Sequence, residues 1–346
     1  MALQSSGAIS LDDLHVEVGG TSGTTCSLND PDIRALINVG DSAGQSIQQY
    51  YGVSSEVGLP TGGSTVNGQV QLKEITASTY ISAGGTLRIP SSMWVWSDNT
   101  SVAALTIDIS CTIINDGKVI GKGGTGGYGN YPGGGYNASG NGNGQDGGPA
   151  IKINSGVSGV TITNSSGAFI AGGGGGGGAS GVEPMNTYSG GGGGAGGGVG
   201  GQGGGVGLQP GGTGGALNAQ GTQPTTYATG GYGGDAGGGG VRSGNEDGRS
   251  GAGGGGGRIL PGAASYSPNT AHIQGGGAGN AGSNGGAGGY GGASGGGGGW
   301  GAAGGRGYRG AFTGIQCQGG AGGKAVEDSG NSYTLSNSGT IYGATT

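Results

Sequence analysis

Residues 286–310 read GAGGYGGASGGGGGWGAAGGRGYRG, and every third residue of this run, from Gly286 to Gly310, is glycine. A repeat of three fits neither an α-helix, with about 3.6 residues per turn, nor a strand, whose side chains alternate with a period of two. It is the repeat of the polyproline II helix, which has three residues per turn and no internal hydrogen bonds. A disordered linker has no reason to keep one register. The run therefore predicts polyproline II helices.

Glycine accounts for 104 of the 346 residues, and most of it follows Gly121. Ordering glycine costs more backbone entropy than ordering any other residue type. Helices packed side by side can offset this cost with shared N–H···O=C bonds and Cα–H···O contacts, if the facing residues lack a Cβ. The all-glycine runs 172–178 and 295–299 suit helices enclosed on every side, whereas residues 121–129 suit the surface. Ten prolines are too few for collagen, so we expect a bundle, or sandwich, of glycine-rich polyproline II helices.

The composition excludes several classes of protein. Charged residues make up 9% and aromatic residues 5% of the chain, so an ordinary hydrophobic core would be small for this length. The net charge of −6 argues against nucleic acid as a partner. The sequence shows no signal-peptide pattern and no apolar run near the roughly 20 residues of a membrane-spanning helix. Three widely spaced cysteines match no metal or redox spacing. We therefore expect no metal, no cofactor and no signal peptide.

The remaining patterns divide the chain into four parts. Residues 1–55 predict a small α+β module, with strands at 9–11 and 16–18 and a helix that starts at 29–32 and ends at Gly40. Residues 56–68 read as a linker. Residues 69–120 hold short strand-like runs, which predict a small β-sandwich or β-solenoid unit in which Trp94 and Trp96 pack. Residues 121–346 form the glycine-rich bundle with flanking β elements, so the predicted fold class is mostly irregular and β.

One repeat links the β unit to the glycine-rich part. Residues 112–121, 161–172 and 334–343 each read as a strand, a tight turn that contains asparagine, a second strand and a glycine. Residues 148–151 (GPAI) and 323–326 (GKAV) are also alike and precede the last two copies. We interpret the copies as β elements stacked beside the bundle, which fix where the chain enters and leaves it.

Three blocks in the first part resemble the N-terminal module of many bacteriophage tail and tail-fibre proteins. They are residues 7–14 (GAISLDDL), 27–34 (SLNDPDIR) and 49–52 (QYYG). The resemblance implies that the module mounts the chain on other phage tail proteins. The residues expected to serve this attachment are Leu11, Leu14, Ile33, Leu36, Tyr50 and Tyr51.

The strand–turn–strand units that feed the glycine runs, within residues 112–346, are similar to the glycine-rich adhesins at the tips of long tail fibres of T-even-like phages. In that family, glycine helices form a sandwich and the loops between them touch the bacterial receptor. The resemblance implies a virion tail protein, made in the host cytoplasm, that attaches to a bacterial outer-membrane protein or to lipopolysaccharide. Those adhesins cap a separate fibre, whereas this chain carries its own tail-mounting module. A homotrimer is one assembly that the sequence leaves open.

Candidate binding residues lie where the glycine runs are interrupted, at 181–188, 208–229, 241–250, 258–274 and 300–318. Loops on a rigid scaffold carry binding residues, and Tyr, Trp and Arg are enriched in binding hot spots. The pair Tyr308 and Arg309, with Trp300 and Phe312 nearby, is the preferred patch. The predicted receptor-binding residues are Tyr188, Tyr227, Tyr266, His272, Trp300, Arg306, Tyr308, Arg309 and Phe312.

No catalytic motif stands out from the background. Residues 292–296 match the nucleophile-elbow pattern only because glycine is so frequent, and they lack its strand–turn–helix setting. Glu183, Asp235, Glu246 and Asp247 could supply two carboxylates for glycan hydrolysis, but nothing in their spacing selects them. We therefore interpret the chain as a non-enzymatic adhesin with no catalytic residue. Two alternatives stay open: a tailspike-like glycan depolymerase, and a structural tail-tip protein without receptor contact. A third, an ice-binding protein, fits the tail-like N-terminus poorly.

Overall fold

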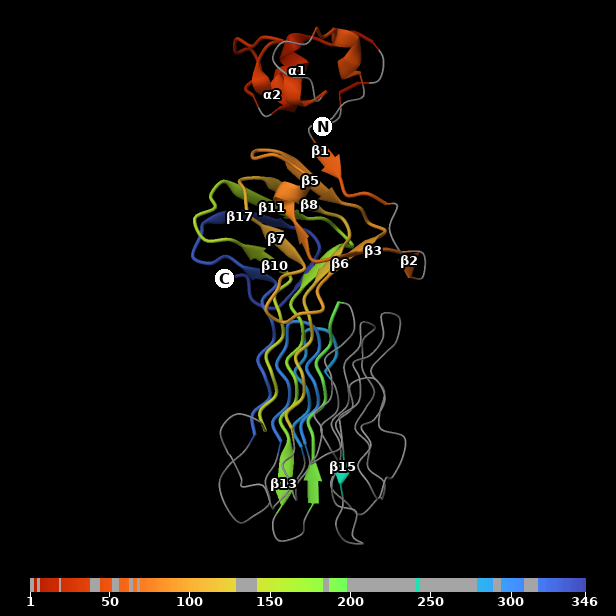
Figure 1. The fold of residues 1–346 in the computed structure, drawn as a ribbon, viewed down its shortest axis with the longest axis vertical. Coiled ribbons are helices and arrows are strands. Elements are labelled where there is room, and N and C mark those ends of the chain that lie inside the picture. The colour runs from red at the N-terminus through yellow and green to blue at the C-terminus, as the bar shows by residue number, and fades with distance from the viewer. Residues whose placement is uncertain are drawn as a thin grey trace.

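The computed structural model describes residues 3–4, 7–18, 20–37, 44–51, 56–61, 65–66, 69–128, 142–182, 187–197, 241–242, 279–288, 294–307 and 317–346. Figure 1 shows three parts in series along the long axis: a small helical module, a β body, and extended segments that run away from the body. The first and the last of the described strands, β1 (Glu56–Gly58) and β18 (Thr340–Tyr342), both belong to the β body (Figure 1).

The described residues of the N-terminal module form short helices joined by turns and coil, and none of them is in a strand. The module contains α1 (Leu11–Glu17), α2 (Pro31–Ala35) and the 3-10 helix η1 (Ile47–Tyr50). The predicted strands at 9–11 and 16–18 are therefore wrong, and so is the α+β assignment. A capping box starts α1: Asp13 N–H donates to Ser10 Oγ at 3.1 Å, and Ser10 N–H donates to Asp13 Oδ2 at 2.7 Å. Helix α2 begins at the expected proline but ends at Ala35, while Gly40 lies outside the described residues.

The β body is a solenoid of three mainly parallel sheets, which each coil of the chain visits in the same order. Sheet 1 contains β2 (Thr65–Val66), β3 (Gln69–Lys73), β6 (Met93–Trp96), β9 (Lys118–Ile120), β12 (Phe169–Ala171) and β18 (Thr340–Tyr342). Sheet 2 contains β4 (Ile75–Thr76), β7 (Leu105–Ile107), β10 (Ile151–Ile153) and β16 (Val326–Glu327). Sheet 3 contains β1 (Glu56–Gly58), β5 (Thr86–Ile89), β8 (Thr112–Asn115), β11 (Val160–Asn164) and β17 (Tyr333–Asn337). A short 3-10 helix, η2 (Ala77–Thr79), follows β4.

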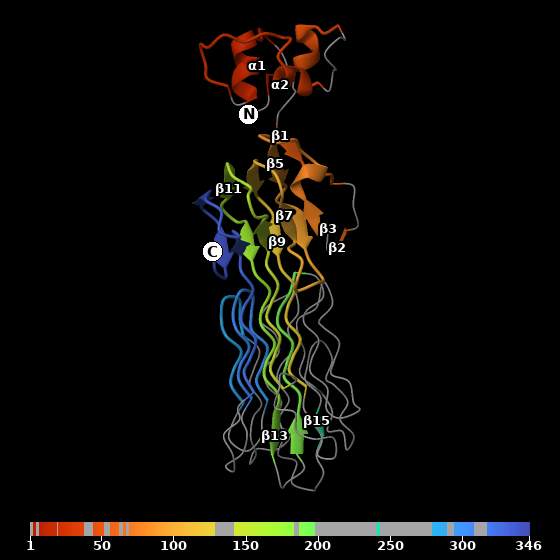
Figure 2. The ribbon, with the colours of Figure 1, turned by 60° about the vertical axis from the view of Figure 1, so that its left-hand side comes forward.

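Apolar side chains stacked in columns fill the solenoid, because alternate residues of each strand point inward. In sheet 3, Leu87, Ile113 and Ile162 are paired in register and are fully buried. Sheet 1 contributes Val95, Val119 and Ile170 in the same way. In sheet 2 the column is Leu105, Ile151 and Val326. The solenoid, which contains this core, lies between the N-terminal module and the glycine-rich segments (Figure 2).

The solenoid extends beyond the predicted β unit at both ends. The predicted linker 56–68 contains β1, which pairs with β5, and β2, which pairs with β3. Arg88 anchors β1 through an ion pair of 2.9 Å with Glu56, while the N–H of the buried Leu59 donates to the Arg88 carbonyl at 2.9 Å. The predicted boundary at 120/121 also fails, because β10, β11, β12 and β16–β18 join the sheets of the earlier strands.

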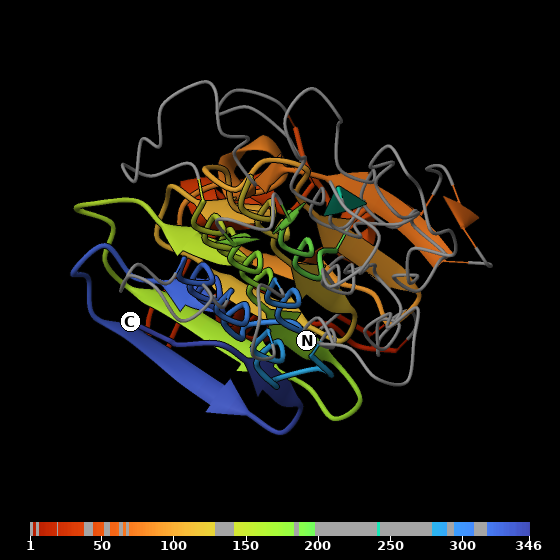
Figure 3. The same cartoon turned by 90° about the horizontal axis from the view of Figure 1, so that it is seen from below.

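The glycine-rich segments are loops that leave the solenoid at one corner, between sheet 1 and sheet 2. In the first coil the connection between the two sheets is the single residue Glu74, at φ 50°. The same connection is residues 97–104 in the second coil, 121–150 in the third and 172–325 in the fourth. Figure 3, seen from below, shows the segments gathered beneath the solenoid, with its strands crossing above them. We call the described stretches 121–128, 142–148, 172–179, 190–197, 279–288, 294–299, 301–307 and 317–323 the glycine segments.

Segment 172–179 is enclosed by six other glycine segments. Every backbone N–H from Gly173 to Ala179 donates to a neighbour at 2.7–2.9 Å, and the acceptor segment repeats every three residues in the order 142–148, 190–197, 301–307. Its carbonyls accept from segments 121–128, 294–299 and 317–323. A Cβ on Gly173 or Gly176 would lie 1.8 or 2.0 Å from a neighbouring carbonyl oxygen. The prediction that the run 172–178 is surrounded on every side is confirmed.

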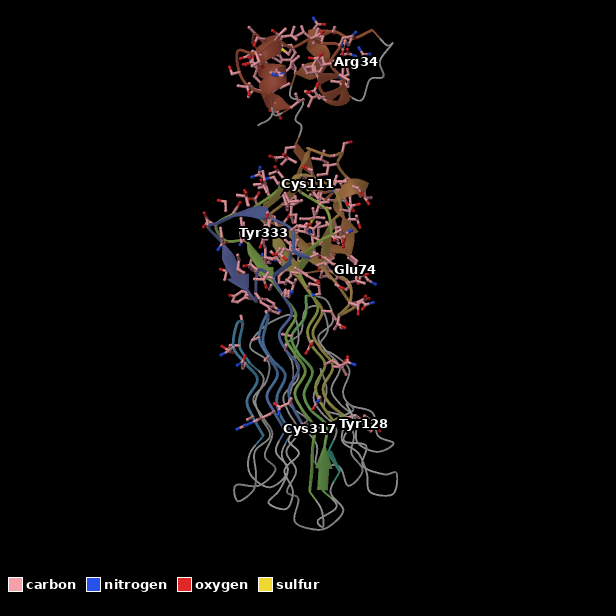
Figure 4. The ribbon with its side chains drawn as sticks, turned by 90° about the vertical axis from the view of Figure 1, so that its left-hand side faces the viewer. Arg34, Glu74, Cys111, Tyr128, Cys317 and Tyr333 are labelled. Carbon is pink, nitrogen blue, oxygen red and sulfur yellow. The ribbon has the colours of Figure 1, made fainter. Side chains whose placement is uncertain are left out.

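The thiol of Cys111 provides a test of the solenoid core. Cys111 is 2% exposed among the core side chains, and burial raises the pKa of its thiol to about 11 (Figure 4). We expect a maleimide at pH 8 to modify Cys26 and Cys317, which are half-buried, much faster than Cys111. The pKa of this thiol is higher in the folded than in the unfolded protein. Its contribution to the free energy of unfolding is therefore complete at any pH below the unfolded pKa. That contribution is lost as the pH rises through about 9 to 11. Equal labelling of all three thiols in native protein would contradict the packing described.

Candidate functional site

The end of the molecule farthest from the N-terminal module is built from the distal ends of the glycine segments. Ala179 N–H donates to the Gly142 carbonyl at 2.8 Å, Gly191 N–H to Gly127 at 2.9 Å, and Gly307 N–H to Cys317 at 2.9 Å. These bonds bring together the points at which the described segments meet residues 129–141, 183–186 and 308–316. Tyr128 and Cys317 lie at this end in Figure 4. Several breaks in the glycine pattern therefore meet at one place.

A small antiparallel sheet continues the segments at this end. It consists of β13 (Ser180–Val182), β14 (Thr187–Ser189) and β15 (Val241–Arg242), with β14 in the middle (Figure 1). Its register places Tyr188 opposite Gly181 on one side and opposite Arg242 on the other. Residues 182 and 241 are far apart in the sequence, so the sheet gathers two of the predicted interruptions.

The structure places three of the nine predicted receptor-binding residues. Tyr188 is the central residue of β14. Arg306 is exposed near the distal end of segment 301–307, where its carbonyl accepts a hydrogen bond of 2.9 Å from Gly288 N–H. Trp300 lies at the other end of the bundle. The rest fall outside the described residues: Tyr227, Tyr266, His272, Tyr308, Arg309 and Phe312.

Trp300 is a correction to the predicted patch, because it is 8% exposed and packs on the outer face of sheet 1. Its ring stacks on Phe169 with centroids 5.0 Å apart, and it contacts Trp94 and Tyr342 at 6.4 and 6.0 Å. Its Nε1 donates to the Gly196 carbonyl at 3.4 Å. Trp300 thus joins the bundle to the solenoid.

The same aromatic cluster holds a cation. Lys118 Nζ lies 5.3 Å from the centre of the Trp94 ring and 5.7 Å from that of Phe169, and burial lowers the pKa of this ammonium. Trp94 is 9% exposed, so the expectation that it packs is confirmed, whereas Trp96 is half-buried. The cluster serves the junction between solenoid and bundle.

Sequence reasoning missed Tyr128, which is 36% exposed at the distal end of segment 121–128. The signal was present: residues 129–141 interrupt the glycine pattern and contain Tyr131 and Tyr136. Because this interruption is rich in glycine itself, it was not separated from the runs around it. Tyr128 joins Tyr188 and Arg306 as a candidate contact at the far end.

The opposite end presents the predicted attachment residues, but half of them are internal. Leu14, Ile33 and Tyr50 are fully buried and form the core of the N-terminal module. Leu11 is 36% exposed, and Leu36 and Tyr51 are half-buried. Val16, 47% exposed on α1, was not predicted. Of the six predicted attachment residues, the three buried ones form the core of the module, and the others are at least partly accessible to another protein.

A cavity of about 360 Å³ lies between the module and the solenoid. Val18, Asp32 and Leu36 line it from the module, and Val57 and residues 80–85 line it from the solenoid. Leu36 therefore faces the body of the protein as well as the module.

The described residues hold no obvious reaction centre. They contain no group of three or more His, Cys, Asp or Glu that could bind a metal ion. The pKa of Asp13 is lowered by hydrogen bonds from Ser10, and that of Asp98 by a bond from Lys73, so these carboxylates serve local structure. Glu183, Asp235, Glu246 and Asp247 lie outside the described residues. No helix in the described ranges has the length and apolar character needed to cross a bilayer.

Comparisons with known proteins give one family. The model of the family described as phage tail fibre adhesin Gp38 matches residues 61–252, more than half of the chain. Among solved structures, the crystal structure of the gp37-gp38 adhesin tip complex of the bacteriophage S16 long tail fiber is similar, with 18% sequence identity over 90% of each chain and a TM-score of 0.36. A search of curated proteins finds no match.

Proposed function

Since the chain belongs to the phage tail fibre adhesin Gp38 family, we propose that the far end of its glycine segments binds a bacterial surface receptor. The protein is an adhesin of the phage tail. Its N-terminal module attaches to other tail proteins, the solenoid and the bundle act as a rigid extension, and the far end carries the contact residues. The receptor is an outer-membrane protein or lipopolysaccharide, and the protein binds it without catalysing a reaction.

The observation that supports this proposal is the convergence of the interruptions. Hydrogen bonds among Gly142, Ala179, Gly307 and Cys317 hold the ends of separate segments together, and the sheet β13–β14–β15 adds a fixed frame. Variable loops on a scaffold of this kind can change without disturbing the segments that support them. Tyr128, Tyr188, Arg242 and Arg306 are described residues of this end, and the undescribed predictions Tyr227, Tyr266, His272, Tyr308, Arg309 and Phe312 remain proposed contacts.

We further propose that the glycine segments are polyproline II helices. The three-residue repeat of their hydrogen-bond partners supports this assignment, because three residues complete one turn of that helix. Such helices have no hydrogen bonds of their own, so their stability comes from their neighbours.

Exchange of the interruptions tests the function. Residues 181–188, 208–229, 241–250, 258–274 and 308–318 are replaced together by those of a relative that infects a different host. We expect adsorption to the original host to fall at least roughly 30-fold, as the loss of one or more binding hot spots implies, and adsorption to the new host to appear. The matched control exchanges residues 1–55, which should block assembly into virions but leave binding of the isolated protein unchanged. An unchanged host range after the loop exchange would refute the proposal.

The same purified protein separates binding from catalysis. Incubation with capsule polysaccharide or lipopolysaccharide should release no new reducing ends. Their appearance would favour a glycan depolymerase.

A further inference from the structure

The register of the solenoid continues into the bundle without a shift. In sheet 1, Lys118 pairs with Phe169 and Ile120 with Ala171. Directly beyond these strands, Gly121 N–H donates to the Ala171 carbonyl, Gly124 to Gly174 and Gly127 to Gly177, at 2.8–2.9 Å. The acceptor advances by three residues each time the donor does. The pairing of β9 with β12 thus sets the pairing of segment 121–128 with segment 172–179.

The returning segments follow the same rule on sheet 2. Ile151 pairs with Val326 in β10 and β16. Before these strands, Ala150 N–H donates to Lys324, Gly147 to Ala321 and Gly144 to Gln318, at 2.9–3.0 Å. The steps of three again keep one register from the distal end of the bundle to the solenoid.

Contacts of glycine with glycine inside a run do not distinguish one register from the next, so the run 172–178 resists a slip of three residues only at its ends. There the slip would bring Ala179 and Ser180 into the places of Gly176 and Gly177, where a Cβ would lie 2.0 or 2.1 Å from a neighbouring carbonyl oxygen. Such a slip would move one segment by about 9 Å along its neighbour, at about 3.1 Å per residue, and would displace whatever it carries at the far end. Over most of their length the runs therefore need a determinant of register that lies outside them.

A ladder of three asparagines in sheet 3, whose last member Asn337 is exposed, can supply such a determinant. Asn115 Nδ2 donates to Asn164 Oδ1 at 2.8 Å, and Asn164 Nδ2 donates to Asn337 Oδ1 at 2.8 Å. The same amides also bond across to the next coil, Asn115 to the Phe169 carbonyl at 3.3 Å and Asn164 to the Thr340 carbonyl at 3.1 Å. Asn115 and Asn164 are fully buried. A shifted coil would leave these amides buried without partners, as a buried asparagine does when it fixes the register of a coiled coil.

We propose that Asn164, with Asn115 and Asn337, is a positioning residue for the adhesive end of the molecule. The ladder lies just before β9, β12 and β18, and the first two of these strands run directly into the glycine segments. By fixing the register of neighbouring coils, the ladder also fixes the register of the glycine segments that continue from them. The register of the segments in turn decides which residues lie together at the far end. The last step rests on the proposed receptor-binding function, whereas the control of register does not.

A native thiol allows the register to be read by cross-linking. A Cβ on Gly142 would lie 2.4 Å from Cys317 Sγ, so Gly142→Cys should form a disulfide with Cys317 in the register described. Gln145 is three residues further along the same segment, where it neighbours Gly320. Gln145→Cys should reach Cys317 only after a slip of three residues. The two reporters are compared in full-length protein under mild oxidation.

In the otherwise unchanged chain we expect the Gly142→Cys reporter to cross-link and the Gln145→Cys reporter to remain reduced. Adding Asn164→Ala should lower the ratio of the first product to the second at least tenfold and should weaken adsorption. Asn164→Ser, which keeps a short polar group, should lie between the two. The control is Ile162→Val, which removes one methyl group from the core two residues before Asn164 on the same strand. It should leave the ratio unchanged.

Each outcome bears on one part of the proposal. If Asn164→Ala is destabilised as Ile162→Val is but keeps the original cross-link, the ladder does not set the register and the inference fails. If Asn164→Ala does not fold, Asn164→Ser and Asn115→Ala carry the same test. If the cross-link shifts while adsorption is unchanged, the register control stands and the placement of the receptor contact at the far end is refuted.

Discussion

Replacing Gly176 with alanine is expected to unfold the bundle. The new Cβ would stand 2.0 Å from the Thr125 carbonyl oxygen, 2.4 Å from its carbon and 2.8 Å from Gly126 N. All three are backbone atoms of a segment that is itself bonded to segment 172–179, so no rotamer change relieves the contact. Separating the two segments would break the bonds from Gly124 N–H to the Gly174 carbonyl and from Gly127 N–H to the Gly177 carbonyl. We expect a loss of stability above the usual 1–3 kcal/mol of overpacking, at about 4 kcal/mol or more.

Limited proteolysis and chemical denaturation of the purified variant measure this effect. Gly58→Ala is the matched control, because a Cβ on Gly58 meets no atom within 4 Å. It should change the stability by less than about 0.5 kcal/mol. A Gly176→Ala protein as stable as the Gly58→Ala protein would show that segment 172–179 is not enclosed as described.

Removing the indole of Trp300 is expected to have the second largest effect. Trp300 stacks on Phe169, touches Trp94 and Tyr342, and is 8% exposed, so alanine would leave a cavity between bundle and solenoid. Truncation of a buried tryptophan costs about 3–5 kcal/mol. The backbone of the adjacent Gly301, at φ +66°, packs so closely against that of Tyr342 and Gly343 that an added Cβ would lie 2.3 Å away, which leaves it little room to shift into the space.

Denaturant unfolding followed by circular dichroism tests this prediction. Tyr128→Ala removes an aromatic ring that is 36% exposed at the far end and should cost less than about 1 kcal/mol. Trp300→Ala should also speed the proteolysis of the glycine segments relative to the solenoid. If the Trp300→Ala protein were as stable as the Tyr128→Ala protein, Trp300 would be a surface residue, and the packing of the bundle on the solenoid described above would be wrong.

The repeats gave the most reliable predictions from the sequence. The strands of the copies at 112–121, 161–172 and 334–343 pair in register, with Thr112, Thr161 and Thr334 adjacent and Asn115, Asn164 and Asn337 adjacent. The motif before the last two copies also pairs as expected, Ile151 with Val326. Both succeeded because stacked coils repeat the same environment, so the residues that fit it repeat as well.

The errors came from tertiary contacts that leave little local signal. The strand predicted at 16–18 is instead the end of helix α1, which begins at a capping box formed by Ser10 and Asp13. Serine and aspartate are also common in loops, so these two residues do not by themselves indicate a helix. Strands β1 and β2 were not predicted within the linker, because each is very short and pairs with a strand further along the chain. Trp300 read as a loop hot spot because its aromatic partners are remote in sequence. The residues predicted to serve attachment include both buried and exposed side chains, which the sequence did not separate.

Amide hydrogen exchange of the full-length protein tests the central claim most directly, namely that backbone bonds between glycine segments make a rigid scaffold. The amides of residues 173–178 belong to no helix or strand, yet each donates to a neighbour at 2.7–2.9 Å. We predict that they exchange as slowly as those of β11 in the solenoid core. Exchange of residues 173–178 at the rate of an unstructured peptide, while β11 stays protected, would contradict the account.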